Sequence, residues 1–102
     1  HRLFSRYRAD VAIYGVGGVD LDGRLLDFHE DEVRAREEMR RNARRTILIA
    51  DRSKFGRCAA AVGGWLSDAD TIVVDEMPAT EYRALLTCLP GSVVVSRGDC
   101  AA

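Results

Sequence analysis

The chain has 102 residues, of which 47% are hydrophobic and 30% charged, and its formal net charge at pH 7 is -1. These values are typical of one ordinary globular domain with a modest core. The net charge gives no overall basic field for nucleic acid, although arginines cluster locally in residues 34–45. No apolar stretch approaches the ~20 residues that cross a bilayer, and no segment resembles a signal peptide.

Three cysteines, Cys58, Cys88 and Cys100, are widely spaced, and only His1 and His29 could join them in binding a metal. An odd number of cysteines without a Cys-x-x-Cys pair predicts neither a disulfide framework nor a metal site. We therefore expect no metal or other cofactor, and a location in the reducing cytoplasm.

The first predicted elements are a strand over residues 10–14 and a glycine-rich loop over residues 15–23 that is not expected to be regular structure. The spacing of Gly15, Gly17 and Gly18 does not match a dinucleotide fingerprint, and no helix follows directly, so a nucleotide site is not expected. The glycines would allow a ligand to approach the backbone closely. Two consecutive turns are the alternative interpretation.

A helix is predicted over residues 30–45, with acidic residues in its first turn and arginines in its last. This charge order complements the helix dipole at both ends. The basic end could contact DNA, but a solvated helix end explains it better.

The most informative segment is residues 46–56. Residues 46–50 form a continuous β-branched run, which predicts a strand buried on both faces. Asp51, Ser53 and Lys54 follow its carboxyl end, where open parallel sheets bind ligands. A lysine there suits a phosphate or carboxylate. The alternative is a surface turn that only ends the strand.

Four further elements complete the chain. They are a strand over residues 58–62 broken by Gly63 and Gly64, a strand over 71–74, a helix over 81–88 capped by Thr80, and a strand over 92–95. The order of elements predicts an α/β fold with a largely parallel sheet flanked by helices. The Arg97-Gly98-Asp99 tripeptide is interpreted as a chance match to an integrin motif.

Several segments together resemble a known family. Residues 9–13, 18–20, 50–56 and 70–75, with the helix through Arg36 and Met39 between them, resemble the C-terminal effector-sensing domain of DeoR-family bacterial transcriptional repressors. The resemblance covers about residues 9–96. Within the family, residues 26–28 and 42–46 are most similar to the glycerol-3-phosphate regulon repressor branch.

The resemblance implies a ribose-5-phosphate isomerase-like fold and a sensor for a phosphorylated sugar or polyol, possibly glycerol 3-phosphate. Lys54 would pair with the phosphate, while Ser53 and Asp51 would orient the lysine or bond ligand hydroxyls. The remaining expected effector-binding residues are the loop residues Gly15, Gly17, Gly18 and Asp20, and Arg36 as a second cation.

The same fold raises the alternative of an isomerase-type enzyme. The isomerases have acids opposite Tyr14 and Gly17, and their catalytic glutamate falls at Arg36, or at Glu37 if the alignment slips by one. Proton transfer between neighbouring carbons needs a positioned base. Lys54 matches a substrate-binding lysine of the isomerases, so we expect binding without catalysis and no enzyme activity.

The family's first sensor strands, its phosphate loop and its winged helix-turn-helix have no counterpart before His1. We therefore expect residues 1–102 to be the C-terminal part of a sensor domain. DNA would be bound only through the absent N-terminal domain, no membrane would be bound, and the protein would form a homo-oligomer. Trp65 is expected to close the core, and the alternative is an exposed anchor of an oligomerisation module with a dead pocket.

Overall fold

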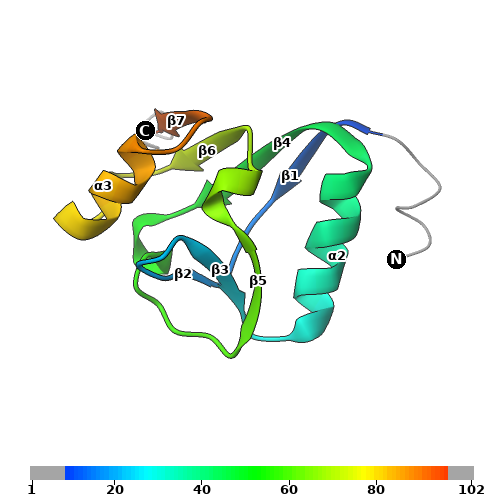
Figure 1. Cartoon of the computed structure of the whole chain (residues 1–102), viewed down its shortest axis with the longest axis horizontal. Coiled ribbons are helices and arrows are strands. Elements are labelled where there is room, and N and C mark those ends of the chain that lie inside the picture. The colour runs from blue at the N-terminus through cyan, green and yellow to red at the C-terminus, as the bar shows by residue number, and fades with distance from the viewer. Residues whose placement is uncertain (1–8, 97–102) are drawn as a thin grey trace, which may run out of the picture.

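The computed structural model describes residues 9–96, which form a four-stranded sheet, a three-stranded sheet and helices packed around them (Figure 1). The larger sheet has the order β1-β4-β6-β7 and is parallel throughout, which confirms the predicted α/β class. Its strands are β1 (Ala9–Tyr14), β4 (Ala43–Ala50), β6 (Thr71–Val74) and β7 (Ser92–Val95).

The smaller sheet is antiparallel and has the order β2-β3-β5. It consists of β2 (Gly18–Val19), β3 (Arg24–Asp27) and β5 (Ala61–Trp65). The α-helices are α2 (Glu30–Arg41) and α3 (Thr80–Thr87), and two short 3-10 helices are η1 (Arg52–Lys54) and η2 (Leu66–Asp68). No helix within residues 9–96 is both long and apolar enough to span a membrane.

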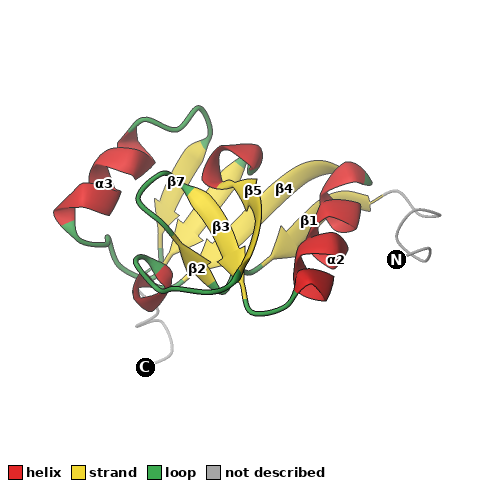
Figure 2. Cartoon of the chain, turned by 60° about the horizontal axis from the view of Figure 1, so that its bottom comes forward, coloured by secondary structure: helices red, strands yellow, loops and turns green. Residues whose placement is uncertain are grey.

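The core lies between the two sheets (Figure 2). Leu48 of β4 and Ile72 of β6 face it from the larger sheet, and Leu25 of β3 faces it from the smaller one. Leu86 of α3 joins the same cluster. The small sheet and α3 therefore both cover the same face of the parallel sheet.

The opposite face of the parallel sheet is exposed, so the prediction that residues 46–50 are buried on both faces is wrong. Leu48 and Ala50 are buried, but Ile49 between them is 49% exposed. Ile13 of β1 and Val94 of β7 share this outer face and are 54% and 47% exposed. Residues on alternate sides of a strand have opposite environments when the described elements cover only one side.

The helix predicted over residues 30–45 is four residues shorter. It ends at Arg41, with Asn42 as its C-cap. Arg44 and Arg45 belong to β4 instead, because the chain from Ala43 onward pairs with β1. The predicted acidic first turn of this helix is present.

The segment after η1 also differs from its prediction. The strand spans Ala61–Trp65 rather than residues 58–62, and Gly63 and Gly64 lie inside it. Pairing with β3 holds the strand on both sides of these glycines, and the register shifts between Arg24 and Leu26. Position 63 suits glycine because Val33 of α2 occupies the space of a side chain there. An ideal Cβ at Gly63 would lie 2.1 Å from a methyl carbon of Val33.

Two smaller predictions were also wrong. The glycine-rich loop contains β2 and is followed by β3, which the irregular reading did not anticipate. Thr80 is the first residue of α3, not its cap; Ala79 occupies that position without a side-chain bond. The Arg97-Gly98-Asp99 tripeptide, His1 and Cys100 lie outside the described residues.

Trp65 does not close the core. It is 43% exposed, and the guanidinium of Arg24 lies 4.8 Å from its ring centroid. The next residue, Leu66, is buried in the core. Trp65 is at the surface and Leu66 is in the core because β5 ends at Trp65 and η2, which begins at Leu66, turns that side chain inward.

A buried ion pair joins the glycine loop to the helix. Asp27, at the end of β3, accepts the backbone N–H of Gly17 at 3.0 Å and forms an ion pair with Arg36 of α2. The second terminal nitrogen of Arg36 donates to the carbonyl of Gly63 in β5 at 2.7 Å. Both charged residues are only 4% exposed. The pair thus connects the glycine loop, β3, β5 and α2 at one point.

We expect Gly18→Ala to destabilise the fold, because an ideal Cβ there would lie 2.2 Å from the carbonyl oxygen of Arg57. Overpacking of this kind costs about 1–3 kcal/mol. Gly15→Ala is the matched control, since its Cβ would meet nothing closer than 3.9 Å. Urea denaturation measures both free energies of unfolding, and equal values would contradict the close packing.

Removing one partner of the buried pair should be more damaging. Arg36→Met should lower the free energy of unfolding by about 3–5 kcal/mol, because it leaves the Asp27 carboxylate buried without its counter-charge. The double variant with Asp27→Leu should recover part of this loss.

Arg34→Met is the control for that experiment, because Arg34 is an exposed arginine of the same helix whose pair with Glu30 spans 3.8 Å in solvent. Such a pair contributes at most about 1 kcal/mol. An Arg36→Met variant as stable as Arg34→Met would show that the buried pair does not hold the fold.

Candidate functional site

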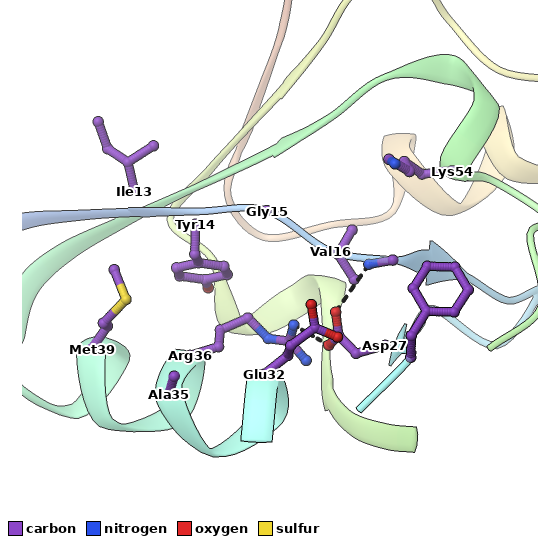
Figure 3. A pocket seen from close by; sticks show the side chains of 12 residues that line it. Ile13, Tyr14, Gly15, Val16, Asp27, Glu32, Ala35, Arg36, Met39 and Lys54 are labelled. Atoms are coloured by element: carbon purple, nitrogen blue, oxygen red, sulfur yellow. Dashed lines mark hydrogen bonds and ion pairs between the residues drawn. The ribbon is translucent and has the colours of Figure 1, made fainter. Parts of the chain in front are cut away.

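A pocket of about 450 Å³ lies between the end of β1, the start of α2 and the η1 turn (Figure 3). β1 and the glycine loop supply one wall, α2 supplies another, and Lys54 reaches it from η1. The side chains and backbone that matter most for its chemistry are Tyr14, Gly17, Asp27, Glu32, Arg36 and Lys54.

Lys54 is positioned by a tightly bonded turn at the carboxyl end of β4. Its backbone N–H donates to the carbonyl of Asp51 at 3.0 Å, and the N–H of Arg52 donates to the carboxylate of Asp75, after β6, at 2.7 Å. Beyond the lysine, the N–H of Gly56 bonds Val19 of β2 at 2.8 Å. The turn is therefore fixed to both sheets.

No carboxylate of the described residues neutralises the ammonium of Lys54. Within residues 9–96, no carboxylate lies within ion-pair distance, 4.0 Å, of it. The side chain is partly buried and lines the pocket. Lys54 can therefore offer a full positive charge to an anionic group in the pocket.

Asp51 and Ser53 build the turn rather than the pocket. The Asp51 carboxylate accepts the N–H of Ser53 at 3.0 Å and also its hydroxyl. The hydrogen bond from that hydroxyl holds the pKa of Asp51 below its ordinary value, and the positive charges of Lys54 and Arg57 act in the same direction. Both residues are exposed and neither lines the pocket. Their contribution to the site is to shape the turn that carries Lys54.

The glycine loop is divided between two surfaces. Gly15 and Gly17 line the pocket, whereas Gly18 belongs to β2. Asp20 faces a second hollow of about 330 Å³, and its carboxylate accepts two backbone N–H groups of the following turn, those of Asp22 and Arg24, both at 2.9 Å. Asp20 thus closes its own turn, apart from the pocket that holds Lys54.

Arg36 does lie at the pocket, but not as a free second cation. Its charge is compensated by Asp27, and its remaining terminal nitrogen is bonded to Gly63. An anion could recruit Arg36 only by breaking a buried ion pair, which costs several kcal/mol. The Nε of Arg36 is buried without a hydrogen-bond partner among the described residues, and the expectation that Arg36 binds the effector as a second cation stays a prediction.

The pocket residues that sequence reasoning missed include Asp27, Phe28 and Glu32. Asp27 interrupts the apolar segment before α2 nine residues ahead of Arg36, and this isolated charge was the available signal. Glu32 accepts the backbone N–H of His29 at 3.1 Å and caps its own helix. Phe28 carries no pattern that separates it from a core residue.

The pocket therefore has two unlike ends. Asp27 and Arg36 cancel each other, which leaves Lys54 as a cation on one side and Glu32 as an acceptor on the other. Burial raises the pKa of Tyr14, whose hydroxyl is buried without a hydrogen-bond partner among the described residues. This arrangement suits a small molecule with an anionic group and hydroxyl donors.

Residues 9–96 contain no group of three or more His, Cys, Asp and Glu side chains that could hold a metal ion. Cys58 and Cys88 are free and exposed.

Comparisons with known proteins identify the family to which the chain is similar. The DeoR C-terminal sensor domain family matches residues 1–76. The glycerol-3-phosphate regulon repressor of Escherichia coli K12 is 39% identical over 85 residues, which cover 83% of this chain and 34% of that protein.

Two further relatives have comparable sequence identity to this chain. The glycerol-3-phosphate regulon repressor of Haemophilus influenzae is 38% identical over 76 residues, covering 74% of this chain and 30% of that protein. The deoxyribose operon repressor of Escherichia coli K12 is 32% identical over 81 residues, covering 79% and 32%. The chain spans about a third of the length of these curated relatives. By its sequence and its parallel α/β fold, the chain belongs to the DeoR-type sensor domains of transcriptional repressors.

Proposed function

We propose that this chain is the effector-binding part of a bacterial transcriptional repressor and that it binds a phosphorylated sugar or polyol. The observation that carries the proposal is the uncompensated ammonium of Lys54 at a pocket of about 450 Å³. Two of the relatives are named glycerol-3-phosphate regulon repressors, so glycerol 3-phosphate is the first ligand to test.

The proposed binding mode follows the unlike ends of the pocket. The phosphate pairs with Lys54, and the polyol hydroxyls point toward the carboxylate of Glu32. Gly15 and Gly17 have no side chains, which lets the ligand approach the backbone after β1. Asp51 and Ser53 contribute indirectly, by holding the turn that carries the lysine.

Regulation would require a second state and a DNA-binding region beyond these residues. A ligand shifts an equilibrium only by its difference in affinity for two states, so effector binding would weaken operator binding by that difference. The exposed apolar face of the parallel sheet supports a role within a larger assembly, such as a homo-oligomer or a longer polypeptide in which other elements cover it.

We propose a sensor rather than a sugar-phosphate isomerase. The positions that hold loop acids in the isomerases are Tyr14, whose hydroxyl is kept neutral by burial, and Gly17. The carboxylates that do line the pocket are Asp27, which is paired with Arg36, and Glu32, which is bonded to the backbone at the start of α2. A base held in this way is poorly placed for proton transfer.

A second candidate is an oligomerisation module whose pocket is inactive. Its specific support is Trp65, which is 43% exposed and covered on one side by Arg24, since tryptophan and arginine are enriched in subunit contacts. This candidate requires that no phosphorylated ligand binds, so ligand titration separates it from the sensor.

Replacing the lysine should abolish most of the affinity. We expect Lys54→Met to weaken glycerol 3-phosphate binding by roughly 2–5 kcal/mol, because the variant keeps the apolar stem and loses the charge. Isothermal titration calorimetry measures the dissociation constant of the chain and the variant.

The matched control for this experiment is Arg52→Met. It removes a positive charge from the same turn, but the Arg52 guanidinium faces Glu76 at 4.0 Å and does not line the pocket. The proposal is wrong if Lys54→Met binds as tightly as Arg52→Met. No heat with any phosphorylated sugar or polyol would favour the inactive module.

A further inference from the structure

Pairing of Arg36 with Asp27 leaves the proposed phosphate site one positive charge short. A phosphate monoester carries close to two negative charges at neutral pH. Lys54 supplies one positive charge, and the second cation expected from the sequence is neutralised. This inference rests on the proposed function and concerns the group that balances the second charge.

Arg57 is placed to supply that charge. It follows Lys54 by three residues, and its backbone N–H donates to the lysine carbonyl at 3.2 Å. Its guanidinium lies 5.2 Å from the ring centroid of Phe28, a residue that lines the pocket. Arg57 itself borders the second hollow, so Phe28 stands between the arginine and the pocket.

The guanidinium of Arg57 is uncompensated. Among the described residues, no carboxylate lies within 4.0 Å of it, and the side chain is exposed. The positive charges of both Arg57 and Lys54 act on the carboxylate of Asp51, which places the two cations around the same turn. The turn thus carries two cations without an ion-pair partner among the described residues: Lys54, which lines the pocket, and Arg57, which contacts Phe28 at its rim.

The backbone of Arg57 is held while its side chain is not. Its carbonyl lies against Gly18, where a Cβ would come within 2.2 Å. The long side chain extends from this fixed point over the half-exposed ring of Phe28. An aromatic face holds a guanidinium by a cation–π contact that uses none of its N–H donors. These N–H groups remain available to a planar or tetrahedral oxyanion.

Other exposed arginines are less suited to this role. Arg24 lies over Trp65, on the outer face of the small sheet, and Arg52 faces Glu76. Neither lines the pocket or contacts a residue described as lining it. Of these three arginines, Arg57 is the one that contacts a residue lining the pocket, through Phe28.

We propose that Arg57 is the second cation of the effector site and that the phosphate group is held between Lys54 and Arg57 at the Phe28 side of the pocket. Phe28 serves as the platform that keeps the guanidinium at the rim. The fork of an arginine can donate two parallel hydrogen bonds to one phosphate, which favours a dianionic phosphomonoester over a singly charged ligand.

The test titrates the chain and three variants with glycerol 3-phosphate by calorimetry. Arg57→Gln should raise the dissociation constant about tenfold or more, as expected for a lost charge-assisted hydrogen bond. Phe28→Leu keeps an apolar side chain but removes the platform, and should weaken binding by a smaller factor. Arg52→Gln is the control that removes an equal charge from the same turn.

The pH dependence gives a readout that a purely structural residue would not change. The second phosphate proton is lost with a pKa of about 6, so the affinity of the chain should rise between about pH 5 and 7, within one unit of that value. Arg57→Gln should flatten this rise. Circular dichroism of Arg57→Gln checks that the substitution leaves the fold intact.

The outcomes separate the two proposals. If Lys54→Met loses affinity but Arg57→Gln matches Arg52→Gln at every pH, the role of Arg57 is refuted and the sensor proposal stands. If the unmodified chain binds no phosphorylated polyol, both the sensor proposal and the role of Arg57 are refuted. The role of Arg57 is supported if Arg57→Gln binds about tenfold more weakly and has a flattened pH profile while Arg52→Gln shows neither change.

Discussion

The ion pair between Asp27 and Arg36 is the constraint on which the rest of the site depends. One carboxylate holds the N–H of Gly17 and the guanidinium of Arg36, and that guanidinium also holds Gly63. Because both charges are buried, neither can leave without exposing the other to an apolar surrounding. The loop after β1, the helix α2 and the strand β5 are therefore fixed relative to one another, and the pocket lies where they meet.

The same constraint decides which charges a ligand can reach. It removes Arg36 from the set of free cations and leaves those carried by the turn after β4. That turn owes its shape to Asp51 and Asp75, which bond backbone N–H groups rather than the ligand. Structural carboxylates and free cations thus occupy separate positions around the carboxyl ends of the parallel strands, as expected for an anion site in an open α/β sheet.

The parallel sheet and the position of Lys54 could be predicted because they depend on local patterns: β-branched runs, and a polar turn directly after a buried strand. The course of residues 58–65 could not, since glycines usually interrupt strands and only the packing of Val33 against Gly63 explains their place in β5. The role of Arg36 was missed for the same reason. Its partner, Asp27, is nine residues away, and the sequence does not show that both side chains are buried.

The central claim is that the pocket between the glycine loop, α2 and Lys54 is where an anionic effector binds. An NMR titration of the ¹⁵N-labelled chain with glycerol 3-phosphate tests it residue by residue. The account predicts saturable shifts of the amide signals of Gly15, Gly17 and Lys54, with little change along β7. Shifts confined to α3 and β7, or no saturable shift at all, would contradict it.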